Sequence, residues 1–246
     1  MNVDTLLAAM PGLSRAKAEA YLGPMEAALQ EFAITSELRA RMWLAQVGHE
    51  SLSLKYFEEI ASGAAYEGRR DLGNTQPGDG KRFKGRGPIQ LTGRANYTTA
   101  GAALQLPLVQ DPPMAADPKY AFRISAWWWE AHGLNPISDK ADVTAATRRI
   151  NGGTNGLADR QSRYERARAL GKAVVPGPAP VPETQQPPEG TMFIRNKGTV
   201  YQLIFAGPQS YWRSIPAAAA GRIPAAWILD DADGAWLGLW RVGAAA

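Results

Sequence analysis

Cysteine is absent from the 246-residue sequence, and histidine occurs only twice. Without cysteine the chain can form no disulfide bond, thiol nucleophile or thiolate metal site, and two histidines leave little for a nitrogen-based metal centre. We therefore expect neither a metal nor a cofactor, which argues against a redox enzyme or a zinc enzyme.

Long apolar runs are also missing, and we expect no secretory signal peptide. No stretch approaches the roughly eighteen apolar residues that a membrane-spanning helix requires. Residues 1–13 lack the basic region of a secretory signal peptide, and Asp4 and Pro11 interrupt their apolar part. We expect a protein that starts in the cytoplasm and has no stable association with membranes.

Blocks of one charge are short. The formal net charge is +4 and the sequence pI is about 9.4, which mildly favours acidic partners such as nucleic acid or an anionic cell wall. The longest basic blocks are pairs, as at Arg69-Arg70 and Arg148-Arg149. We therefore expect no nucleic-acid partner; a role in binding DNA would require strongly salt-dependent affinity.

Proline marks the boundary between two parts of the chain. Residues 172–189 read KAVVPGPAPVPETQQPPE, and their six prolines exclude a regular helix or a central strand. Such a segment is typical of a semi-rigid extended linker. We predict a first domain in residues 1–171 and a small second module in residues 190–246.

The first domain has the apolar periodicity of helices. Ser36 is a plausible N-cap, and Asp117 followed by Pro118 combines an N-cap with proline at the first helical position. Extended stretches before the linker are short, so we predict a mainly α domain. The predicted helices cover residues 36–50, 117–133, 142–150 and 157–170.

The second module changes to short β-branched and aromatic runs separated by glycine, proline and aspartate, which predicts a small β-rich fold. It holds half of the eight tryptophans in the chain. Indole rings stack on sugars, but they also stabilise small cores, so we expect most to be buried and one or two to bind sugar. The candidates are Trp212, Trp227, Trp236 and Trp240.

Three acids occur close together in VGHESLSLKYFEEIASG, residues 47–63. Two carboxyl groups, one protonated and one ionised, are the minimum equipment for inverting hydrolysis of a glycosidic bond, and they stand roughly 6.5–9.5 Å apart. On one continuous helix Glu50 and Glu59 would be separated by roughly 13 Å along the axis. The chain must therefore turn between them if they act together.

The surroundings of these acids favour different roles. Glu50 ends an apolar helix, where burial and the negative end of the helix dipole favour the protonated acid. Glu59 precedes small residues that are more open to water, which suits a base. In the simpler alternative, Glu50 is an ordinary helix-end carboxylate and Glu58 and Glu59 lie in a solvated loop; spacing alone favours this alternative.

A glycine-framed segment, FKGRGPIQLTGRANY at residues 83–97, follows the acids. Its glycines allow the backbone to come close to a ligand. If the central residues are extended, the period of two places Gln90 and Thr92 on one face and Ile89 and Leu91 on the other. An amide and a hydroxyl on one face suit binding of an N-acetyl group and a water molecule.

Four motifs in this order resemble glycoside hydrolase family 19, and more narrowly its phage endolysin branch. They are HES at 49–51, GRGPIQLTGRANY at 85–97, INGG at 150–153 and ADRQSRY at 158–164. The resemblance covers residues 36–170 and does not reach the second module. It implies a lysozyme-like fold for the first domain.

The resemblance also implies the roles of the acids. Glu50 matches the general acid, Glu59 matches the general base of the endolysin branch, and Thr92 matches a residue that holds the attacking water. Glu58 is the alternative base, and Glu67 is a further candidate ranked below both. In this chain Leu-Ser follows the His-Glu-Ser motif at 49–51, whereas the family commonly has Gly-Gly, so the loop that carries the base could differ.

Further positions match residues of the family that surround the substrate. Arg160 would remain charged at any working pH, and we expect it to keep Glu59 ionised. His49 taken alone is more often a packed residue at the end of a helix than a catalyst. The expected substrate-binding residues are His49, Gln90, Asn96, Asn151 and Arg160.

Together with the acid pair, the resemblance implies a monomeric phage endolysin that hydrolyses β-1,4 bonds of bacterial peptidoglycan by an inverting acid–base mechanism. It would wait in the host cytoplasm, reach the cell wall on release, and use residues 190–246 for wall binding. A chitinase is the alternative within the same chemistry. A non-catalytic glycan-binding protein is the alternative from another class. The motifs leave open whether a muramidase or a glucosaminidase bond is cleaved.

Overall fold

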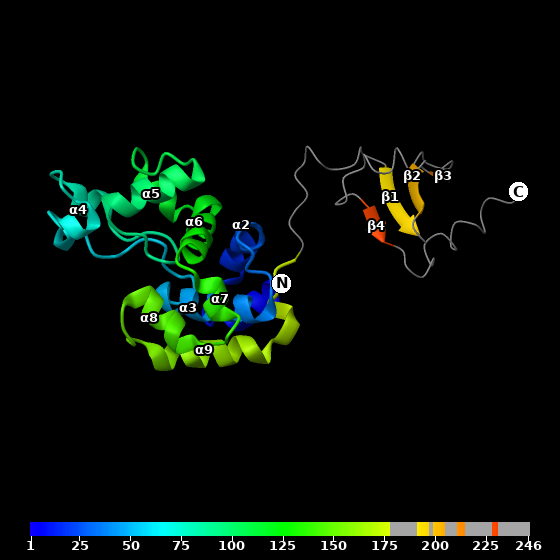
Figure 1. Cartoon of the computed structure of the whole chain (residues 1–246), viewed down its shortest axis with the longest axis horizontal. Coiled ribbons are helices and arrows are strands. Elements are labelled where there is room, and N and C mark those ends of the chain that lie inside the picture. The colour runs from blue at the N-terminus through cyan, green and yellow to red at the C-terminus, as the bar shows by residue number, and fades with distance from the viewer. Residues whose placement is uncertain (178–190, 197–198, 205–210, 215–227, 231–246) are drawn as a thin grey trace, which may run out of the picture. The chain divides into compact units, whose positions relative to one another are not determined.

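A computed structural model describes residues 1–177 and the segments 191–196, 199–204, 211–214 and 228–230 (Figure 1). The chain divides into two compact units, Met1–Ala179 and Pro180–Ala246. No helix among the described residues has the length and apolar character needed to cross a bilayer.

The first unit is helical, as the sequence predicts. Among residues 1–177 the only β pairing is formed by isolated bridges, Glu58 to Arg86 and Arg86 to Leu91. The α-helices are α1 Val3–Ala9, α2 Arg15–Glu31, α3 Glu37–Glu50, α4 Asp79–Arg82, α5 Arg94–Leu104, α6 Pro118–Ala131, α7 Leu134–Ser138, α8 Val143–Asn151 and α9 Leu157–Ala169. The 3-10 helices are η1 Ala64–Tyr66, η2 Arg70–Leu72, η3 Pro112–Ala116 and η4 Gly171–Val174.

Side-chain caps fix where the main helices begin. Ser36 accepts a hydrogen bond from the backbone of Arg39 and starts α3, and Asp117 accepts one from Lys119 and starts α6 with Pro118 at its first position. Each cap satisfies a backbone donor that the helix itself leaves free. Both predicted starting points are confirmed.

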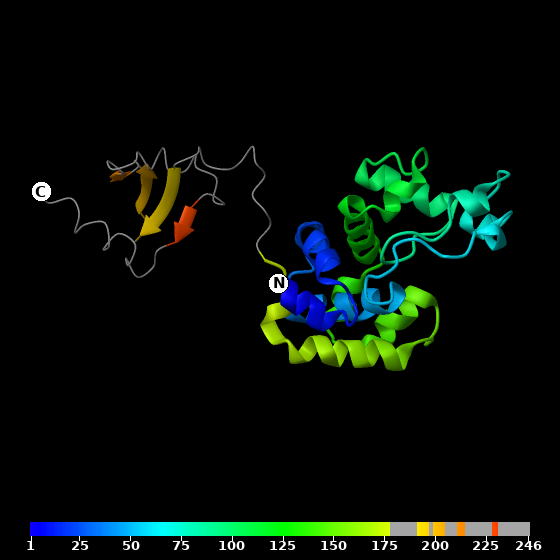
Figure 2. The same ribbon diagram turned by 180° about the vertical axis from the view of Figure 1, so that it is seen from behind.

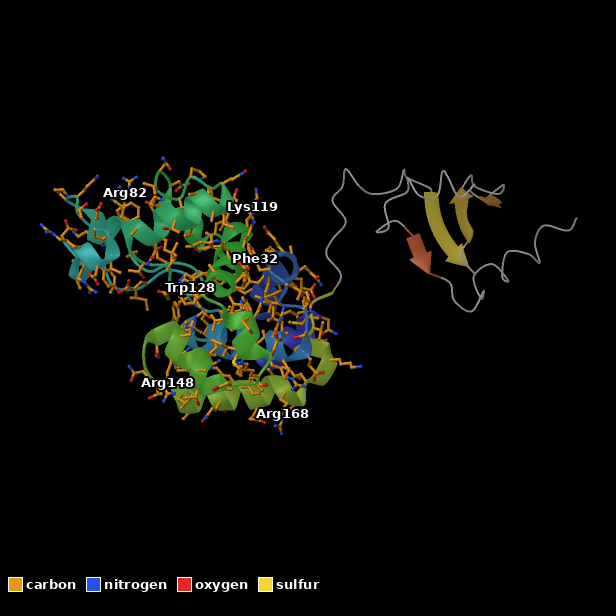
Figure 3. All side chains as sticks on the ribbon, viewed as in Figure 1. Phe32, Arg82, Lys119, Trp128, Arg148 and Arg168 are labelled. Carbon is orange, nitrogen blue, oxygen red and sulfur yellow. The ribbon has the colours of Figure 1, made fainter. Side chains whose placement is uncertain are left out.

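Two hydrophobic clusters form the core of the first unit. The main cluster gathers side chains of α1, α2, α3, α6, α8 and α9, including Trp43 and Trp129, which are fully buried. The second cluster lies around Phe83 and α5. Phe32 and Trp128 pack against both clusters, and Figure 3 shows them between the part that holds α4 and α5 and the part that holds α8 and α9. They therefore connect the two parts of one core.

The first unit continues past residue 171, where the sequence places the end of the domain. Val174, in η4, is fully buried in the main cluster. The backbone N–H of Gly177 donates to Glu26 Oε1 at 2.7 Å, and the Met1 ammonium donates to the same oxygen at 2.7 Å. Proline prevents a regular helix here but does not prevent packing. Residues 178–189 of the predicted linker lie outside the described residues.

Helices α3 and α9 lie side by side in both views of the ribbon (Figure 1 and Figure 2). Hydrogen bonds from Arg160 on α9 to Gln46 and Glu50 on α3 join them. This pairing places the end of α3 beside the start of α9. The candidate acid Glu50 is therefore held by a segment that is 110 residues distant in sequence.

Four short strands are described in the second unit: β1 Thr191–Asn196, β2 Thr199–Ile204, β3 Tyr211–Ser214 and β4 Ile228–Asp230. Their order in the sheet is β3-β2-β1-β4, with β1 antiparallel to β2, β2 antiparallel to β3, and β1 parallel to β4. Trp212 belongs to β3. Trp227, Trp236 and Trp240 lie outside the described residues, so sugar binding by this module stays a prediction.

Candidate active site

The chain leaves α3 immediately after Glu50 and turns, as two cooperating acids require. Ser51 is the C-cap of the helix, and its hydroxyl accepts a hydrogen bond from the backbone of Leu54. Leu52, Ser53 and Leu54 then have φ of 50°, 63° and 62°. Three consecutive left-handed residues without glycine are energetically unfavourable. Residues 52 and 53 are also the positions where the resemblance predicts glycines.

We expect Leu52→Gly to raise the free energy of unfolding by about 0.5–1 kcal/mol, because the left-handed penalty is larger than the entropy that glycine adds to the unfolded chain. Little packing is lost, because Leu52 is 59% exposed. Urea unfolding of the full chain measures the change. Ile60→Gly is the matched control, since Ile60 is 84% exposed and does not have a positive φ. If Leu52→Gly were no more stable than the wild type, the left-handed backbone at Leu52 would not be strained.

Glu50 is held by Arg160. The Nη2 atom of Arg160 donates to Glu50 Oε1 at 2.5 Å, and Nη1 donates to Gln46 Oε1 at 2.7 Å. Arg160 is 1% exposed, whereas the side chain of Glu50 is 21% exposed. Within the described part of the chain no hydrogen bond reaches the second oxygen of Glu50. The expectation that Arg160 pairs with Glu59 is wrong, because the packing of α9 on α3 brings it to Glu50.

His49 is fixed one residue before Glu50. Its Nδ1 lies 2.7 Å from Asp159 Oδ2, and Arg163 Nε donates to the same oxygen at 2.6 Å. Partial burial favours the neutral form of Asp159, but the hydrogen bonds from Arg163 and His49 outweigh it and lower the pKa of this carboxyl. Gly156 packs against the imidazole: a methyl group there would lie 2.3 Å from His49 Nε2. A substrate contact from His49 stays a prediction.

Glu59 is held in a different way. Tyr66 Oη donates to Oε1 at 3.1 Å, and the Gly85 backbone N–H donates to Oε2 at 3.1 Å. Lys84 Nζ donates to the Glu59 carbonyl oxygen at 3.0 Å. Burial is the main cause that raises the pKa of Tyr66, and Glu59 adds to it, so the phenol keeps its proton. Both carboxylate oxygens therefore have fixed donors.

The side chains of Gln90, Thr92 and Glu59 all lie close to Gly85. A methyl group on Gly85 would lie 2.7 Å from Gln90 Oε1 and 3.3 Å from both Glu59 Oε2 and Thr92 Oγ1. The three side chains therefore surround one glycine. Thr92 Oγ1 donates to the Gln90 carbonyl at 2.8 Å, which orients the hydroxyl.

The segment around Gln90 is a turn, so the extended backbone on which the expectation of two faces was conditional does not form. Residues 87–90 form the turn, closed by the bridge between Arg86 and Leu91. Gly87 and Gln90 have φ of 75° and 56°. Ile89 and Leu91 are nevertheless buried, while Gln90 and Thr92 are partly exposed. The expected polar face exists, but a turn produces it.

The alternative acids have other partners. Glu58 pairs with Lys84 at 3.2 Å and with Arg86 at 3.1 Å. Partial burial favours neutral Glu58, but these two cations outweigh it and lower the pKa of the carboxyl. Glu67 accepts hydrogen bonds from the backbone of Gly78 and Gly80. It therefore fixes the loop that leads into α4.

Asn96 and Asn151 make no side-chain hydrogen bond to Glu50 or Glu59 among the described residues. Asn96 is exposed on α5 and donates to the Thr92 carbonyl at 2.7 Å. Asn151, at the end of α8, is exposed; it donates to the Asn155 carbonyl and accepts from the Gly153 N–H. The structure shows local backbone contacts for both. Their contact with substrate stays a prediction.

Sequence reasoning missed three residues that position the acids. Gln46 binds Arg160, Asp159 binds His49, and Tyr66 binds Glu59. Gln46 could have been found, because it is the one polar side chain in the run MWLAQVG at residues 42–48 and lies one turn before Glu50. Tyr66 carried no such signal, since its position depends on how the loop after Glu59 folds.

An open cavity of about 360 Å³ lies beside the loop that follows Glu50. Leu52 and Tyr56 contribute apolar surface, and α9 contributes charged side chains. The charged residues that line it are Lys55, Asp159, Arg163 and Arg166.

Comparison with known proteins links this geometry to one family. A family model described as chitinase class I matches residues 26–162, more than half of the chain. An endochitinase of Arabidopsis thaliana is 46% identical over 111 residues, which cover 45% of this chain and 38% of the endochitinase. A glycosyl hydrolase family 19 domain-containing protein of Haemophilus influenzae is 28% identical over 171 residues, covering 57% of this chain and 84% of that protein.

Solved structures show the same fold. Chitinase C from Streptomyces griseus HUT6037 has a TM-score of 0.58 at 24% identity, covering 72% of this chain and 78% of that one. A bacterial family 19 chitinase has a TM-score of 0.55 at 26% identity, covering 72% of this chain and 97% of that one. The predicted mainly α, lysozyme-like architecture is confirmed. The chain spans 38% of the length of the Arabidopsis endochitinases that it matches, and it belongs to glycoside hydrolase family 19.

Proposed function

We propose that residues 1–177 hydrolyse β-1,4 bonds between N-acetylated amino sugars by single displacement with inversion. The observation that carries this proposal is the gathering of Glu59, Gln90 and Thr92 around Gly85. A carboxylate and a hydroxyl placed together can orient one water molecule, and an adjacent amide can hold an N-acetyl group. Glu50, which lies at the end of α3 and is held by Arg160, supplies the second carboxyl group.

In this mechanism Glu50 donates a proton to the leaving glycosidic oxygen while water attacks the anomeric carbon. Glu59 accepts the proton that the water loses. Arg160 binds only one oxygen of Glu50, which leaves the other to carry the donated proton. Tyr66 and Gly85 keep the Glu59 carboxylate directed toward the water that Thr92 binds.

Chitin is the polymer favoured by the names of the similar proteins, which are endochitinases and bacterial chitinases. Peptidoglycan is the second candidate, because it shares a β-1,4-linked amino-sugar backbone and because a cavity lined by cations lies next to the loop after Glu50. The endolysin role, and wall binding by residues 190–246, belong to this second proposal.

Digestion of N-acetylchitohexaose and of purified peptidoglycan by the full chain tests the proposal. We expect new reducing ends, and the product first formed should be the α-anomer in proton NMR, because single displacement inverts the β configuration. Mass analysis of the peptidoglycan fragments identifies the sugar at the new end. Absence of cleavage on both polymers would refute glycosidase activity, a β-anomer would refute inversion, and an anhydro sugar would indicate a lyase.

A further inference from the structure

The cavity after Glu50 has an excess of positive charge. Among the charged residues that line it, Lys55, Arg163 and Arg166 are cations and Asp159 is the one anion. Asp159 already accepts hydrogen bonds from Arg163 and His49. Its charge is therefore balanced by these two partners, and it does not compensate the remaining cations.

Lys55 and Arg166 lack ionic partners within the described part of the chain. Lys17 adds to the positive potential, because its Nζ donates to the Lys55 carbonyl at 2.9 Å. Arg163, by contrast, is occupied by Asp159 and by the Ser53 hydroxyl at 2.9 Å. Two cations thus border a cavity with no anion of their own, which is an arrangement that attracts an anionic ligand.

Apolar surface accompanies this charge. Leu52 is 59% exposed and Tyr56 is 47% exposed, and both line the same cavity. Large exposed apolar side chains next to unpaired cations fit a ligand that combines a carboxylate with alkyl or sugar surface. A bare inorganic anion would leave that apolar surface in water.

The cavity also lies close to the candidate acid. Its lining includes Leu52, two residues after Glu50, and Asp159, which precedes Arg160, the residue that binds Glu50. A group bound in the cavity would therefore sit near the sugar on which Glu50 acts. Chitin carries no charge that could use these cations.

We propose that the cavity bordered by Lys55 and Arg166 binds a carboxylate carried by the glycan, and that it thereby selects amino-sugar polymers with acidic substituents over chitin. The lactyl ether and the peptide stem of peptidoglycan carry such carboxylates on alkyl groups. This inference rests on the proposed glycosidase function and names its substrate class.

The test compares the full chain with the double variant Lys55→Gln/Arg166→Gln. We measure kcat/KM on soluble peptidoglycan strands and on N-acetylchitohexaose, and take the ratio of the two. The ratio should fall about tenfold, which corresponds to the loss of two partly exposed charge contacts. Arg168→Gln is the matched control on α9: Arg168 pairs with Glu165, does not line the cavity, and lies at the outer edge of the helix (Figure 3).

An unchanged ratio in the double variant, or an equal fall in Arg168→Gln, would overturn the proposal. Binding of N-acetylmuramic acid and of N-acetylglucosamine, followed by NMR, gives a readout that needs no catalysis. The wild-type chain should prefer the acid, and the double variant should lose that preference. If neither polymer is cleaved, the glycosidase proposal fails, while this binding comparison still decides whether the cavity recognises a carboxylate.

Discussion

Replacing Glu50 by glutamine should lower the rate of glycan hydrolysis by about 10²- to 10⁴-fold, the typical contribution of one general acid. Glutamine has nearly the same shape, and its amide oxygen can still accept the hydrogen bond from Arg160 Nη2. It cannot give a proton to the leaving oxygen. The rate of release of reducing ends should therefore fall, while binding of the glycan persists.

Glu31→Gln is the matched control for Glu50→Gln. Glu31 is the last residue of α2 and pairs with Arg123 at 2.8 Å, just as Glu50 is the last residue of α3 and pairs with Arg160. The control should retain wild-type activity. If both variants kept full activity, Glu50 would be an ordinary helix-end carboxylate and another group would donate the proton; a wild-type chain that binds glycan without releasing reducing ends would instead be a non-catalytic glycan-binding protein.

Glu50→Gln also leaves the buried guanidinium of Arg160 without a carboxylate, which should reduce stability. Thermal unfolding of each variant must therefore accompany the assay, and rates should be compared well below the lowest melting temperature. Retained glycan binding shows that the fold persists. A loss of rate under these conditions reports on proton donation.

Glu59→Gln should produce a second loss of about 10²- to 10⁴-fold, because the amide cannot accept a proton from the attacking water. The adjacent Glu58→Gln should change the rate little. Glu58 is already engaged by Lys84 and Arg86, whereas Glu59 shares its surroundings with Thr92. Initial rates on N-acetylchitohexaose or peptidoglycan, whichever the wild type cleaves, measure both variants.

Comparing the rate losses of Glu58→Gln and Glu59→Gln identifies which of the two acids is the general base. A large loss in Glu58→Gln with a small loss in Glu59→Gln would assign the base to Glu58. Equal and small losses in both would remove general-base catalysis from this loop. Tyr66→Phe provides an intermediate case, since it removes one of the donors to Glu59 but leaves the Gly85 N–H.

Local signals in the sequence were sufficient for α3, α6, α8 and α9, whereas the other helices, including the 17-residue α2, were not predicted. N-caps at Ser36 and Asp117 act on donors within the next few residues, so their effect can be predicted without knowledge of the fold. The end of α3 at Glu50 and the turn before Glu59 follow from the same local information.

Contacts between distant segments could not be predicted in this way. Arg160 was expected beside Glu59, but the pairing of α9 with α3 places it on Glu50, and helical periodicity does not say which helices pair. The turn at Gln90 was missed because alternation of buried and exposed residues is shared by a strand and by this turn. Spacing alone also could not tell that Glu58 is neutralised by Lys84 and Arg86.

Gly156, the N-cap of α9, restricts which substitutions are possible at both 156 and 49. Gly156 has a φ of 72°, and the His49 ring occupies the space where any side chain would begin. A descendant of this protein could acquire a larger residue at 156 only after the imidazole had been exchanged for a smaller side chain. Substitution at 49 must therefore precede substitution at 156, and glycine should persist at 156 for as long as histidine occupies 49.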